Sequence, residues 1–399
     1  MERFDFLVVG GGMMGAPCAR YLAEAGHSVA LVAAPEAADT ERHNGPFASH
    51  WDAARITRRV AADPDWSLAS RRSIARYAEI EARSGRRIFR PVGALMAGPA
   101  AGPMEGFTAG FLDVAAGLDD PPEVLDAAAV RARLGIALPE GSRAAYEAEG
   151  GGWLDPRAMR DAQVDLAVGA GAVLVPQAAM ARRGRNVTLA DGTEMSAGHV
   201  VVATGPHAAS DGLLPARPDL KVWGRTVAFA RLSEAEGARL RGMPSAIWVP
   251  EGWAYDLYML PPVRYPDGRL YLKIGGEVSS PRIGSAAEMA AWFRGGGDGA
   301  VGAALLAEMA RALPGLAVEA TSVGPCAVVW SATGFPYIAP AGDGVTVLCG
   351  GNGAAAKCGD ELGRLGACVA TGAGLTGEGY RQDFAAAWAP MSGNRQAVS

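Results

Sequence analysis

A glycine-rich turn between two apolar segments near the start of the chain constrains the fold most. Residues 4–9 form an apolar run typical of a buried parallel strand, residues 13–25 carry apolar side chains at helical spacing, and residues 28–32 form a second apolar run. The first turn carries three glycines at the spacing of dinucleotide-binding loops: Gly10, Gly12 and Gly15. Such glycines permit a tight turn, a close approach to a pyrophosphate and close helix packing, and the helix start attracts the anion. The unit predicts dinucleotide binding; the alternative is a turn that only packs the strand against the helix.

The acid that normally binds a ribose in such a unit is missing. Ala33 stands at the expected place, about twenty residues after the glycines, and Glu36 follows three residues later. Either Glu36 reaches back to the ribose, or the backbone and a water molecule replace the acid; Glu36 fits an exposed loop acid equally well. We therefore count Ala33 and Glu36, together with Met13 and Met14 in the glycine turn, as cofactor-binding candidates.

Composition narrows the partners and the compartment. The 399 residues are enough for two domains or one two-lobed unit, and a formal net charge of −5 without a basic tract argues against a nucleic-acid partner. The five cysteines are scattered and none has zinc-ligand spacing, which favours reduced thiols in a cytoplasmic protein and predicts no metal site. No apolar run reaches the roughly 20 residues that span a bilayer, so no membrane association is expected.

A second glycine-rich turn near the end of the chain decides which dinucleotide is expected. Residues 344–372 have the pattern of a strand, a glycine loop and a helix, and residues 198–208 contain an apolar strand that runs into Thr204 and Gly205. Residues 151–175 precede it as a turn, a helix and a short strand that includes Val173. One glycine loop at each end of the chain, closing on a single sheet, is the organisation of FAD proteins, in which the second helix points at the flavin. An NAD dehydrogenase does not need this C-terminal element.

Five separated motifs, in the same order, resemble the D-amino-acid-oxidase-like FAD amine oxidases, and most closely the branch of monomeric sarcosine oxidase and the fructosyl-amino-acid oxidases. They are the N-terminal glycine turn, "SHWDAARITRR" (49–59), "YLKIGGE" (271–277), "PCAVVWSATGFPYIAP" (325–340) and "GGNGAAAK" (350–357). The second motif is similar to the family's Ser-His-x-Asp-x-Arg-Ile-x-Arg stretch but has one extra residue.

The resemblance implies an α/β protein with two domains. A Rossmann-like FAD-binding domain would be assembled from discontinuous segments, residues 1–85, 150–215 and 323–390. A substrate domain with an antiparallel sheet and helices would use residues 86–149 and 216–322, and residues 391–399 would form a tail. The family also implies a monomer that takes a small amino-acid substrate and O2.

Arg55 and Arg58 lie just after the first strand–helix–strand unit, in a stretch too polar for the core. An arginine binds a carboxylate with two charge-assisted hydrogen bonds, so two guanidinium groups near a flavin suit an anionic substrate. In the related oxidases the second Arg of this stretch and the Lys of the C-terminal loop hold the substrate carboxylate, which implies Arg58 and Lys357 here. The alternatives are an exposed basic run for Arg58 and a surface helix lysine for Lys357.

Lys273 stands on a strand that the flanking Leu272 and Ile274 mark as buried on one face. A lysine there costs free energy unless it is paired or functional; the alternative is a strand-edge lysine that reaches water. In the resembling oxidases this lysine lies near flavin N5 and assists the reduction of O2, a role of charge stabilisation. The resemblance therefore favours an oxidase over a dehydrogenase.

Glu277 departs from the sarcosine oxidases, which carry His at this place, and is similar to the Lys-x-x-x-Glu pair of the fructosyl-amino-acid oxidases. It favours a larger or more polar N-substituent, bound through the amine or a hydroxyl; the alternative is a loop acid. Tyr258 resembles the family's active-site tyrosine, and Trp330 is a candidate for the pocket wall, although aromatic residues more often pack in a core. We expect four catalytic residues: Lys273, Arg55, Glu277 and Tyr258.

Cys326 aligns with the cysteine that attaches FAD through the flavin 8-methyl carbon in sarcosine oxidase, which makes covalent FAD an expectation; the alternative is a small buried apolar residue. The second glycine loop supplies N–H groups that would stabilise negative charge on the reduced flavin. Its Ala354-Ala355 replaces the family's His-Gly, which weakens the case for sarcosine itself. The remaining cofactor-binding candidates lie in the two motifs: Ser49, His50, Arg55, Ile56, Gly350, Gly351, Asn352, Gly353, Ala355 and Lys357.

The resemblance as a whole implies FAD-dependent oxidation of a secondary, N-substituted amino acid to an imine that hydrolyses, with O2 reduced to H2O2. Three alternatives stay open. The chain is an oxidase of glycine or another primary amine, a dehydrogenase with another electron acceptor, or a catalytically silent flavoprotein.

Overall fold

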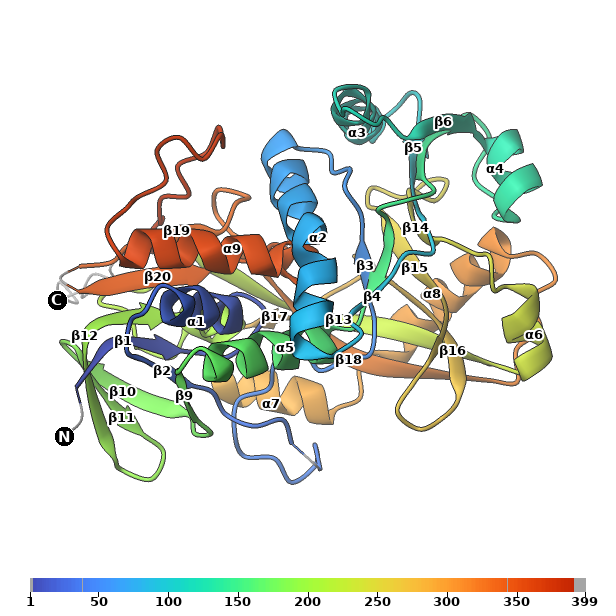
Figure 1. The fold of residues 1–399 in the computed structure, drawn as a ribbon. Helices are drawn as coiled ribbons and strands as arrows, with labels where there is room; N and C mark the ends of the chain where they lie inside the picture. The colour runs from blue at the N-terminus through green and yellow to red at the C-terminus, as the bar shows by residue number, and fades with distance from the viewer. Residues whose placement is uncertain (1–2, 38, 343, 391–399) are drawn as a thin grey trace, which may run out of the picture.

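The structure is a computed structural model that describes residues 3–37, 39–342 and 344–390, so the expected tail at 391–399 lies outside the described residues. Its first sheet has eight strands (Figure 1). Five of them run parallel, in this spatial order: β9 (Val173–Val175), β2 (Val29–Val32), β1 (Arg3–Val9), β12 (Glu194–Val202) and β20 (Val345–Cys349). Three antiparallel strands extend the sheet: β10 (Ala179–Arg183) and β11 (Asn186–Leu189) beside the start of β12, and β19 (Tyr337–Pro340) beside β20.

Both glycine turns follow central strands of this sheet. Gly10 comes directly after β1 and Gly350 directly after β20, with β12 between these two strands. The carboxyl ends of parallel strands meet at one edge, which is where open α/β sheets bind their ligands. The prediction that the two loops close on a single sheet is therefore confirmed.

Four helices cover one face of the sheet: α1 (Gly15–Glu24), α2 (Pro64–Ser84), α5 (Pro156–Gly169) and α9 (Ala355–Ala370). Helix α1 packs against both α5 and α9, and α2 packs against α9 (Figure 1). Helix α1 starts two residues later than expected, because residues 12–14 form a turn. Helix α2 begins where its sequence dictates, since Asp63 accepts hydrogen bonds from the N–H groups of Asp65 and Trp66 and Pro64 follows it.

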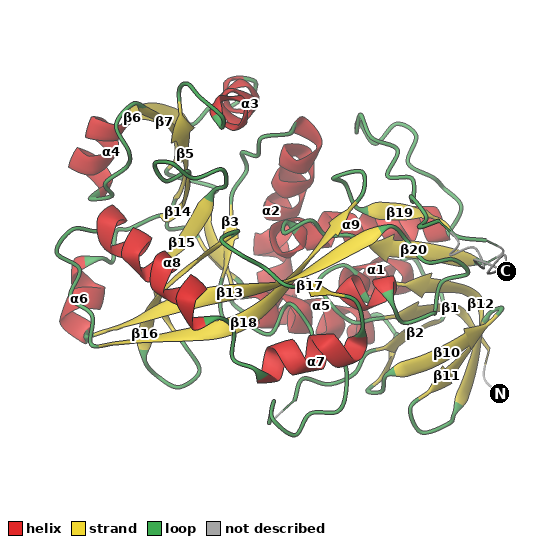
Figure 2. Cartoon of the chain, turned by 180° about the vertical axis from the view of Figure 1, so that it is seen from behind, coloured by secondary structure: helices red, strands yellow, loops and turns green. Residues whose placement is uncertain are grey.

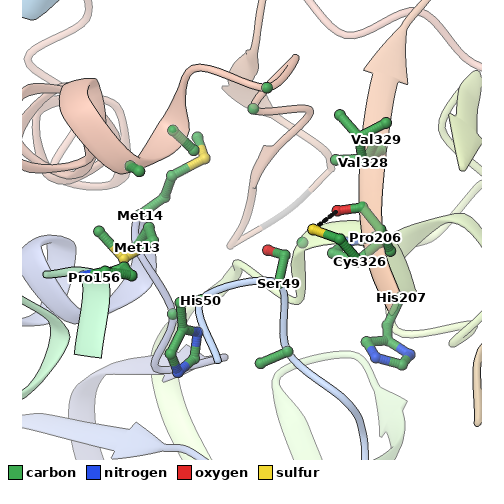
Figure 3. Close-up of a pocket in the computed structure, with 18 of the residues that line it drawn as sticks. Met13, Met14, Ser49, His50, Pro156, Pro206, His207, Cys326, Val328 and Val329 are labelled. Atoms are coloured by element: carbon green, nitrogen blue, oxygen red, sulfur yellow. Dashed lines mark hydrogen bonds between the residues drawn. The ribbon is translucent and has the colours of Figure 1, made fainter. Parts of the chain in front are cut away.

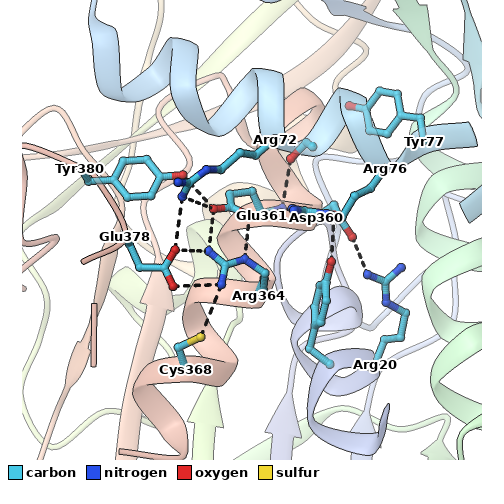
Figure 4. Close-up of polar contacts among 12 residues, drawn as sticks. Arg20, Arg72, Arg76, Tyr77, Asp360, Glu361, Arg364, Cys368, Glu378 and Tyr380 are labelled. Carbon is cyan, nitrogen blue, oxygen red and sulfur yellow. Dashed lines mark hydrogen bonds and ion pairs between the residues drawn. The ribbon is translucent and has the colours of Figure 1, made fainter. Parts of the chain in front are cut away.

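Two buried carboxylates, Asp360 and Glu361, join α9 to its neighbours (Figure 4). Asp360 accepts hydrogen bonds from three helices: from Arg20 at 2.9 Å, Arg76 at 2.5 Å and Gln163 at 2.9 Å. Glu361 is bound by three arginines and a tyrosine: Arg72, Arg76, Arg364 and Tyr380. Because buried charges need partners, this network fixes the helix that follows the second glycine loop.

The second sheet has nine strands and is mostly antiparallel. Its strands are β5 (Ala94–Pro99), β6 (Glu123–Asp126), β7 (Ser142–Glu147), β13 (Leu220–Leu232), β14 (Ser245–Trp248), β15 (Leu257–Arg264), β16 (Leu270–Gly276), β17 (Arg282–Ile283) and β18 (Ala320–Ser331). Helices α3 (Glu105–Ala116), α4 (Ala127–Leu134), α6 (Glu234–Arg239), α7 (Ala286–Arg294) and α8 (Gly299–Ala312) accompany it. A small sheet of β3 (Arg55–Thr57), β8 (Gly152–Leu154) and β4 (Phe89–Arg90) lies between the two larger sheets (Figure 1), and the 3-10 helix η1 (Gly205–Ala209) follows β12.

The long strands β13 and β18 belong to the second sheet and pair along most of their length. They extend from beside the first sheet to the far end of the second sheet (Figure 2). A parallel sheet with packed helices beside a mostly antiparallel sheet confirms the expected α/β class. The expected domain boundary at residue 323 falls inside β18, and the exact division into domains stays a prediction. None of the helices in the described part of the chain is long and apolar enough to cross a bilayer.

Candidate active site

A cavity of about 1250 Å³ lies where the carboxyl edge of the first sheet meets the second sheet. Both glycine turns contribute to its wall, together with β18 and the segment before β3. Figure 3 shows Met13, Met14 and His50 on one side of it and Cys326 and Val328 on the other, with Ser49 between them. The cavity therefore brings together residues from all five sequence motifs, the third through Gly276 and Glu277.

The first glycine turn forms a cradle that only glycine permits. Gly10 has a φ of 106°, and a Cβ there would lie 2.4 Å from the carbonyl oxygen of Ala203. A Cβ at Gly15 would lie 1.8 Å from the carbonyl oxygen of Gly10, so Gly15 serves packing and does not line the cavity. A Cβ added at Gly12 would have one described atom outside its chain neighbours within 4 Å, Nδ1 of His50 at 3.7 Å. The space beside Gly12 therefore leaves room for a ligand.

The two helices that follow the glycine turns lack a side-chain cap. Helix α1 follows Met14, helix α9 follows Ala354, and neither has an acidic residue in its first turn. Their first N–H groups and positive dipole ends therefore face an anionic ligand without a competing side chain. A pyrophosphate at α1 and an electron-rich flavin at α9 fit these two positions, so the residues present suit FAD.

The loop before α9 is held in an unusual backbone conformation. Asn352 has a φ of 46°, between the left-handed glycines Gly350 and Gly353. Its side chain donates to the carbonyl oxygen of Gly350 at 2.7 Å and accepts from the N–H of Ser331 at 2.8 Å. These bonds fix the loop to the end of β18. Gly351, Asn352, Gly353 and Ala355 line the cavity, whereas Gly350 lies outside its lining.

Three of the expected cofactor-binding residues, Ala33, Glu36 and Val173, do not line the cavity, and their role stays a prediction. Glu36 pairs with Arg157, with Oε1 and Nη2 2.5 Å apart, Ala33 is buried under Gly11, and Val173 is 46% exposed. The cavity is lined instead by the neighbours of Ala33, Val32 and Ala34, and by residues 177–180. Thr204, Gly205 and Ile56 do line the cavity, as do Ser49 and His50.

His50 is uncharged at neutral pH. Burial, followed by the charges of Arg160, Arg157 and Arg55, lowers its pKa to about 3. Arg160 donates to the carbonyl oxygen of Gly11 at 3.1 Å and so adds positive charge beside the glycine turn. The positive charge that an anionic ligand would meet here therefore comes from the arginines and not from His50.

Arg58 and Lys357 face the cavity with unused hydrogen-bond donors. Arg58 donates through Nη1 to the carbonyl oxygen of Val60 at 3.1 Å, but its buried Nε has no partner in the described chain. The ammonium of Lys357 makes no hydrogen bond or ion pair with any described residue, and Tyr77 fixes its backbone through a 2.7 Å bond to its carbonyl oxygen. Burial and then Arg58 lower the pKa of Lys357 to about 8. Burial likewise lowers the pKa of Arg58.

Lys273 differs from its expected surroundings. It is 1% exposed and does not line the cavity, because Nζ donates to Asp52 Oδ2 and to the carbonyl oxygen of Ala54, both at 2.6 Å. Burial and then Arg55 lower its pKa, while Cys326 opposes this effect. Arg55 also pairs with Asp52 and donates to the carbonyl oxygen of Ser49 at 2.8 Å. The middle of the strand is thus buried on both faces, and the ammonium of Lys273 lies 5.7 Å from the ring centroid of Tyr258.

Glu277 and Tyr258 line the cavity next to two charged residues that sequence reasoning missed, Arg225 and Asp256. Glu277 forms an ion pair with Arg225 at 2.6 Å, and Arg225 also donates to Ser280 at 2.5 Å. Burial raises the pKa of Tyr258, which keeps it protonated. Trp330 lines the cavity and is 38% exposed.

Cys326 lines the cavity from β18, directly opposite Arg225 in the β13–β18 ladder. Its Sγ lies 3.7 Å from Nη2 of Arg55, and Trp292 holds its backbone through a 2.8 Å bond to its carbonyl oxygen. The thiol therefore faces the cavity beside a cation. Covalent attachment of FAD stays a prediction.

No local signal in the sequence marks Arg225 or Asp256, because β13 and the segment before β15 reach the cavity only through sheet pairing. Asp52 lies inside the motif at 49–59, but its link to Lys273 joins positions 221 residues apart. A lysine on an apolar strand indicates that some buried acid is needed, and this is the signal that could have suggested Asp52.

Known proteins provide a comparison for this geometry. No curated protein matches the chain. Among solved structures, NikD, described as an unusual amino acid oxidase essential for nikkomycin biosynthesis, is 22% identical, with a TM-score of 0.74 over 98% of this chain and 99% of that one. Glycine oxidase from Geobacillus kaustophilus is 18% identical, with a TM-score of 0.67 over 93% and 95%. Fructosyl amine:oxygen oxidoreductase (Amadoriase I) from Aspergillus fumigatus is 16% identical, with a TM-score of 0.64 over 93% and 87%.

These structures share the fold of the chain. Its sequence identifies the family, because the family profile named DAO, FAD dependent oxidoreductase, matches residues 5–368. This match covers both glycine turns, the segment around Arg55 and Arg58, and the strand that carries Cys326. The chain belongs to the family of FAD-dependent oxidoreductases, and FAD is its cofactor.

Proposed function

We propose that this FAD-dependent oxidoreductase oxidises a secondary, N-substituted amino acid to an imine that hydrolyses, with O2 reduced to H2O2. The observation that carries the proposal is the pair of cations with unused donors in the cavity wall, Arg58 and Lys357. Two donors of this kind, one directly after β3 and one in the first turn of α9, suit a substrate carboxylate. Similar structures include an iminodiacetate oxidase from Chelativorans sp. BNC1, a glycine oxidase and an amadoriase, which fits a small amine as substrate.

FAD, when bound, supplies the electron acceptor for the carbon–nitrogen bond that is oxidised. In our proposal Arg58 and Lys357 bind the carboxylate and so orient the carbon next to nitrogen. Met96, Phe107 and Ile247 form an apolar wall of the cavity and exclude water from that carbon. Glu277 and its partner Arg225 make the far side polar, which favours an N-substituent that carries hydrogen-bonding groups.

A dehydrogenase with another electron acceptor is the second candidate, and one observation favours it. The O2-activating role that the resemblance implies for Lys273 needs an available cation near the flavin, but its ammonium already donates to Asp52 and Ala54, and Lys273 does not line the cavity. The neutralised lysine would stabilise developing negative charge on O2 less well. A structure similar to this chain, the L-proline dehydrogenase from P. horikoshii, is 16% identical with a TM-score of 0.68.

The test is a screen of N-alkyl, N-carboxymethyl and sugar-linked amino acids in two parallel assays. Bleaching of the flavin absorbance without O2 reports substrate oxidation, and peroxide release in air reports the oxidase reaction. An oxidase gives both signals with the same substrate, whereas a dehydrogenase gives fast bleaching and little peroxide. A flavin that none of these compounds bleaches refutes the proposal.

Lys357→Met tests the carboxylate site within the same screen. It is expected to raise KM for the best substrate roughly 10- to 100-fold, the range for a charge-assisted hydrogen bond. Lys221→Met is the matched control, because Lys221 is exposed on β13 and lies outside the cavity lining. Equal KM values for the two variants would exclude Lys357 from carboxylate binding.

A further inference from the structure

Asp256 is a carboxylate of the cavity wall that nothing in the described chain binds. It lies directly before β15, and it lines the cavity together with Arg58, Tyr258 and Glu277. Its side chain makes no hydrogen bond or ion pair with another described residue. The side chain is half-buried and faces the cavity, so its lone pairs are available to a ligand.

The other acid of this wall is already occupied. Glu277 pairs with Arg225 at 2.6 Å, and Ser280 accepts a second donor of the same guanidinium. Among the charged groups near Asp256, Arg58 acts on it most strongly, followed by Glu277 and then Arg225. Of the two acids in this wall, Asp256 is therefore the one that can accept hydrogen bonds from a ligand.

The position of Asp256 beside Arg58 has a chemical meaning. In an amino acid the amine is one carbon away from the carboxylate. A carboxylate bound by Arg58 and Lys357 thus brings the amine to the neighbourhood of Arg58, where Asp256 lies. Amino acids carry this amine as an ammonium at neutral pH, and an ammonium has no lone pair to stabilise the cation that forms when the adjacent carbon loses a hydride. The substrate must therefore lose a proton at this point.

We propose that Asp256 binds the ammonium group of the substrate and takes one proton from it. The N–H bond breaks, its electron pair stays on nitrogen, and the proton joins a carboxylate oxygen of Asp256. No oxidant is needed for this step, and it precedes the oxidation. The assignment rests on the proposed function, since it takes an amino acid as the substrate.

Burial supports this role, because it raises the pKa of Asp256 and makes the carboxylate a stronger base than an exposed aspartate. Arg58 and Arg225 act in the opposite direction and Glu277 in the same direction. The other ionisable groups that face this part of the cavity are Arg55, Tyr258, Cys326 and Lys357. The titration of Asp256 must be separated from theirs, which requires a variant at position 256.

The experiment compares wild type with Asp256→Asn in two measurements. Titrations of the flavin absorbance give Kd for trimethylglycine, which has a carboxylate and a permanent cation, and for propionate, which has only the carboxylate. Asp256→Asn is expected to weaken the binding of trimethylglycine roughly 10- to 100-fold, because the ion pair between the carboxylate and the permanent cation is lost, and to leave the binding of propionate unchanged or tighter. The exposed Glu251, in the same segment but outside the cavity lining, provides the control Glu251→Gln, which is expected to match wild type.

The second measurement is the pH profile of kcat/KM with the best substrate. Asp256→Asn is expected to lower kcat/KM at neutral pH and to regain it as the pH approaches the substrate's own amine pKa, whereas a purely structural loss would be equal at all pH values. Asp256→Glu is expected to keep the wild-type profile, and Asp256→Ser replaces Asp256→Asn if the latter does not retain its flavin. Unchanged trimethylglycine affinity and an unchanged profile overturn the proposal. If wild type oxidises no amino acid, the proposed function fails, and the trimethylglycine titration still decides whether Asp256 binds a cation.

Discussion

The buried pair of carboxylates on α9 leads to a sharp prediction about stability. Asp360→Asn removes the charge that balances Arg20, which is 3% exposed, and Arg76, which is partly exposed. Arg20 has no alternative partner of similar quality: its Nε lies 3.7 Å from Glu24 and makes no hydrogen bond. Loss of one partner of a buried ion pair costs about 3–5 kcal/mol. Because Arg76 can turn towards water, we expect the lower end, about 3 kcal/mol.

The assay is urea denaturation followed through tryptophan fluorescence, with the chain's nine tryptophans as reporters. Glu378→Gln is the control, because Glu378 belongs to the same network but its side chain is 24% exposed, so its loss is expected to cost less than the loss of the buried Asp360. The double variant Arg20→Met with Asp360→Leu is expected to recover most of the loss, since apolar residues can replace a buried pair. A change below about 1 kcal/mol for Asp360→Asn would show that the network does not depend on this charge. No recovery in the double variant would show that the loss does not come from the unpaired Arg20.

Four further outcomes are expected. Gly15→Ala is expected to yield a protein purified without yellow colour, because the new Cβ would lie 1.8 Å from the carbonyl oxygen of Gly10 and the turn must move. Carboxylate inhibitors are expected to bind more weakly as the pH rises through 8, where Lys357 loses its proton. Lys357→Arg is expected to remove this pH dependence. The Kd values of the inhibitors at pH 7 and pH 9, measured for both proteins, test this expectation. Burial opposes the ionisation of Glu361, yet hydrogen bonds from Arg364 and Arg76 lower its pKa to about 2 from 4.5. The stability that ionised Glu361 gives the folded protein is therefore complete above pH 4.5 and is lost as the pH falls towards 2. Denaturation at pH 6 and at pH 3 measures this loss. If FAD is covalent, acid precipitation keeps the colour with wild-type protein and releases it from Cys326→Ser; release from both contradicts attachment at Cys326.

Much of the FAD half follows from local patterns. An apolar strand, glycines and an amphipathic helix are short-range features, so β1, α1, β20 and α9 could be predicted from the sequence with their order. Gly15 is required by a backbone contact with Gly10 inside this unit, whereas Gly10 is required by a contact with the carbonyl oxygen of Ala203, directly after β12. The pair Arg58 and Lys357 came from the resemblance, and the structure brings both to one cavity.

The charge partners could not be predicted in the same way. Lys273 reaches Asp52, Glu277 reaches Arg225, and Glu36 reaches Arg157, and each of these pairs joins distant elements. Charged side chains that the sequence motifs offer to a ligand are thus already paired in the fold. Asp256, which no motif marks, has no partner among the described residues.

The amino-acid sequence by itself determined that two glycine turns would hold FAD on one sheet, because each turn is specified by residues close together in the chain. Only the tertiary structure decided which cations and acids of the second sheet remain available to a ligand. The physical reason is that a charge inside a protein is balanced by whichever partner the folded chain brings near, and sheet pairing brings together residues that no spacing rule relates.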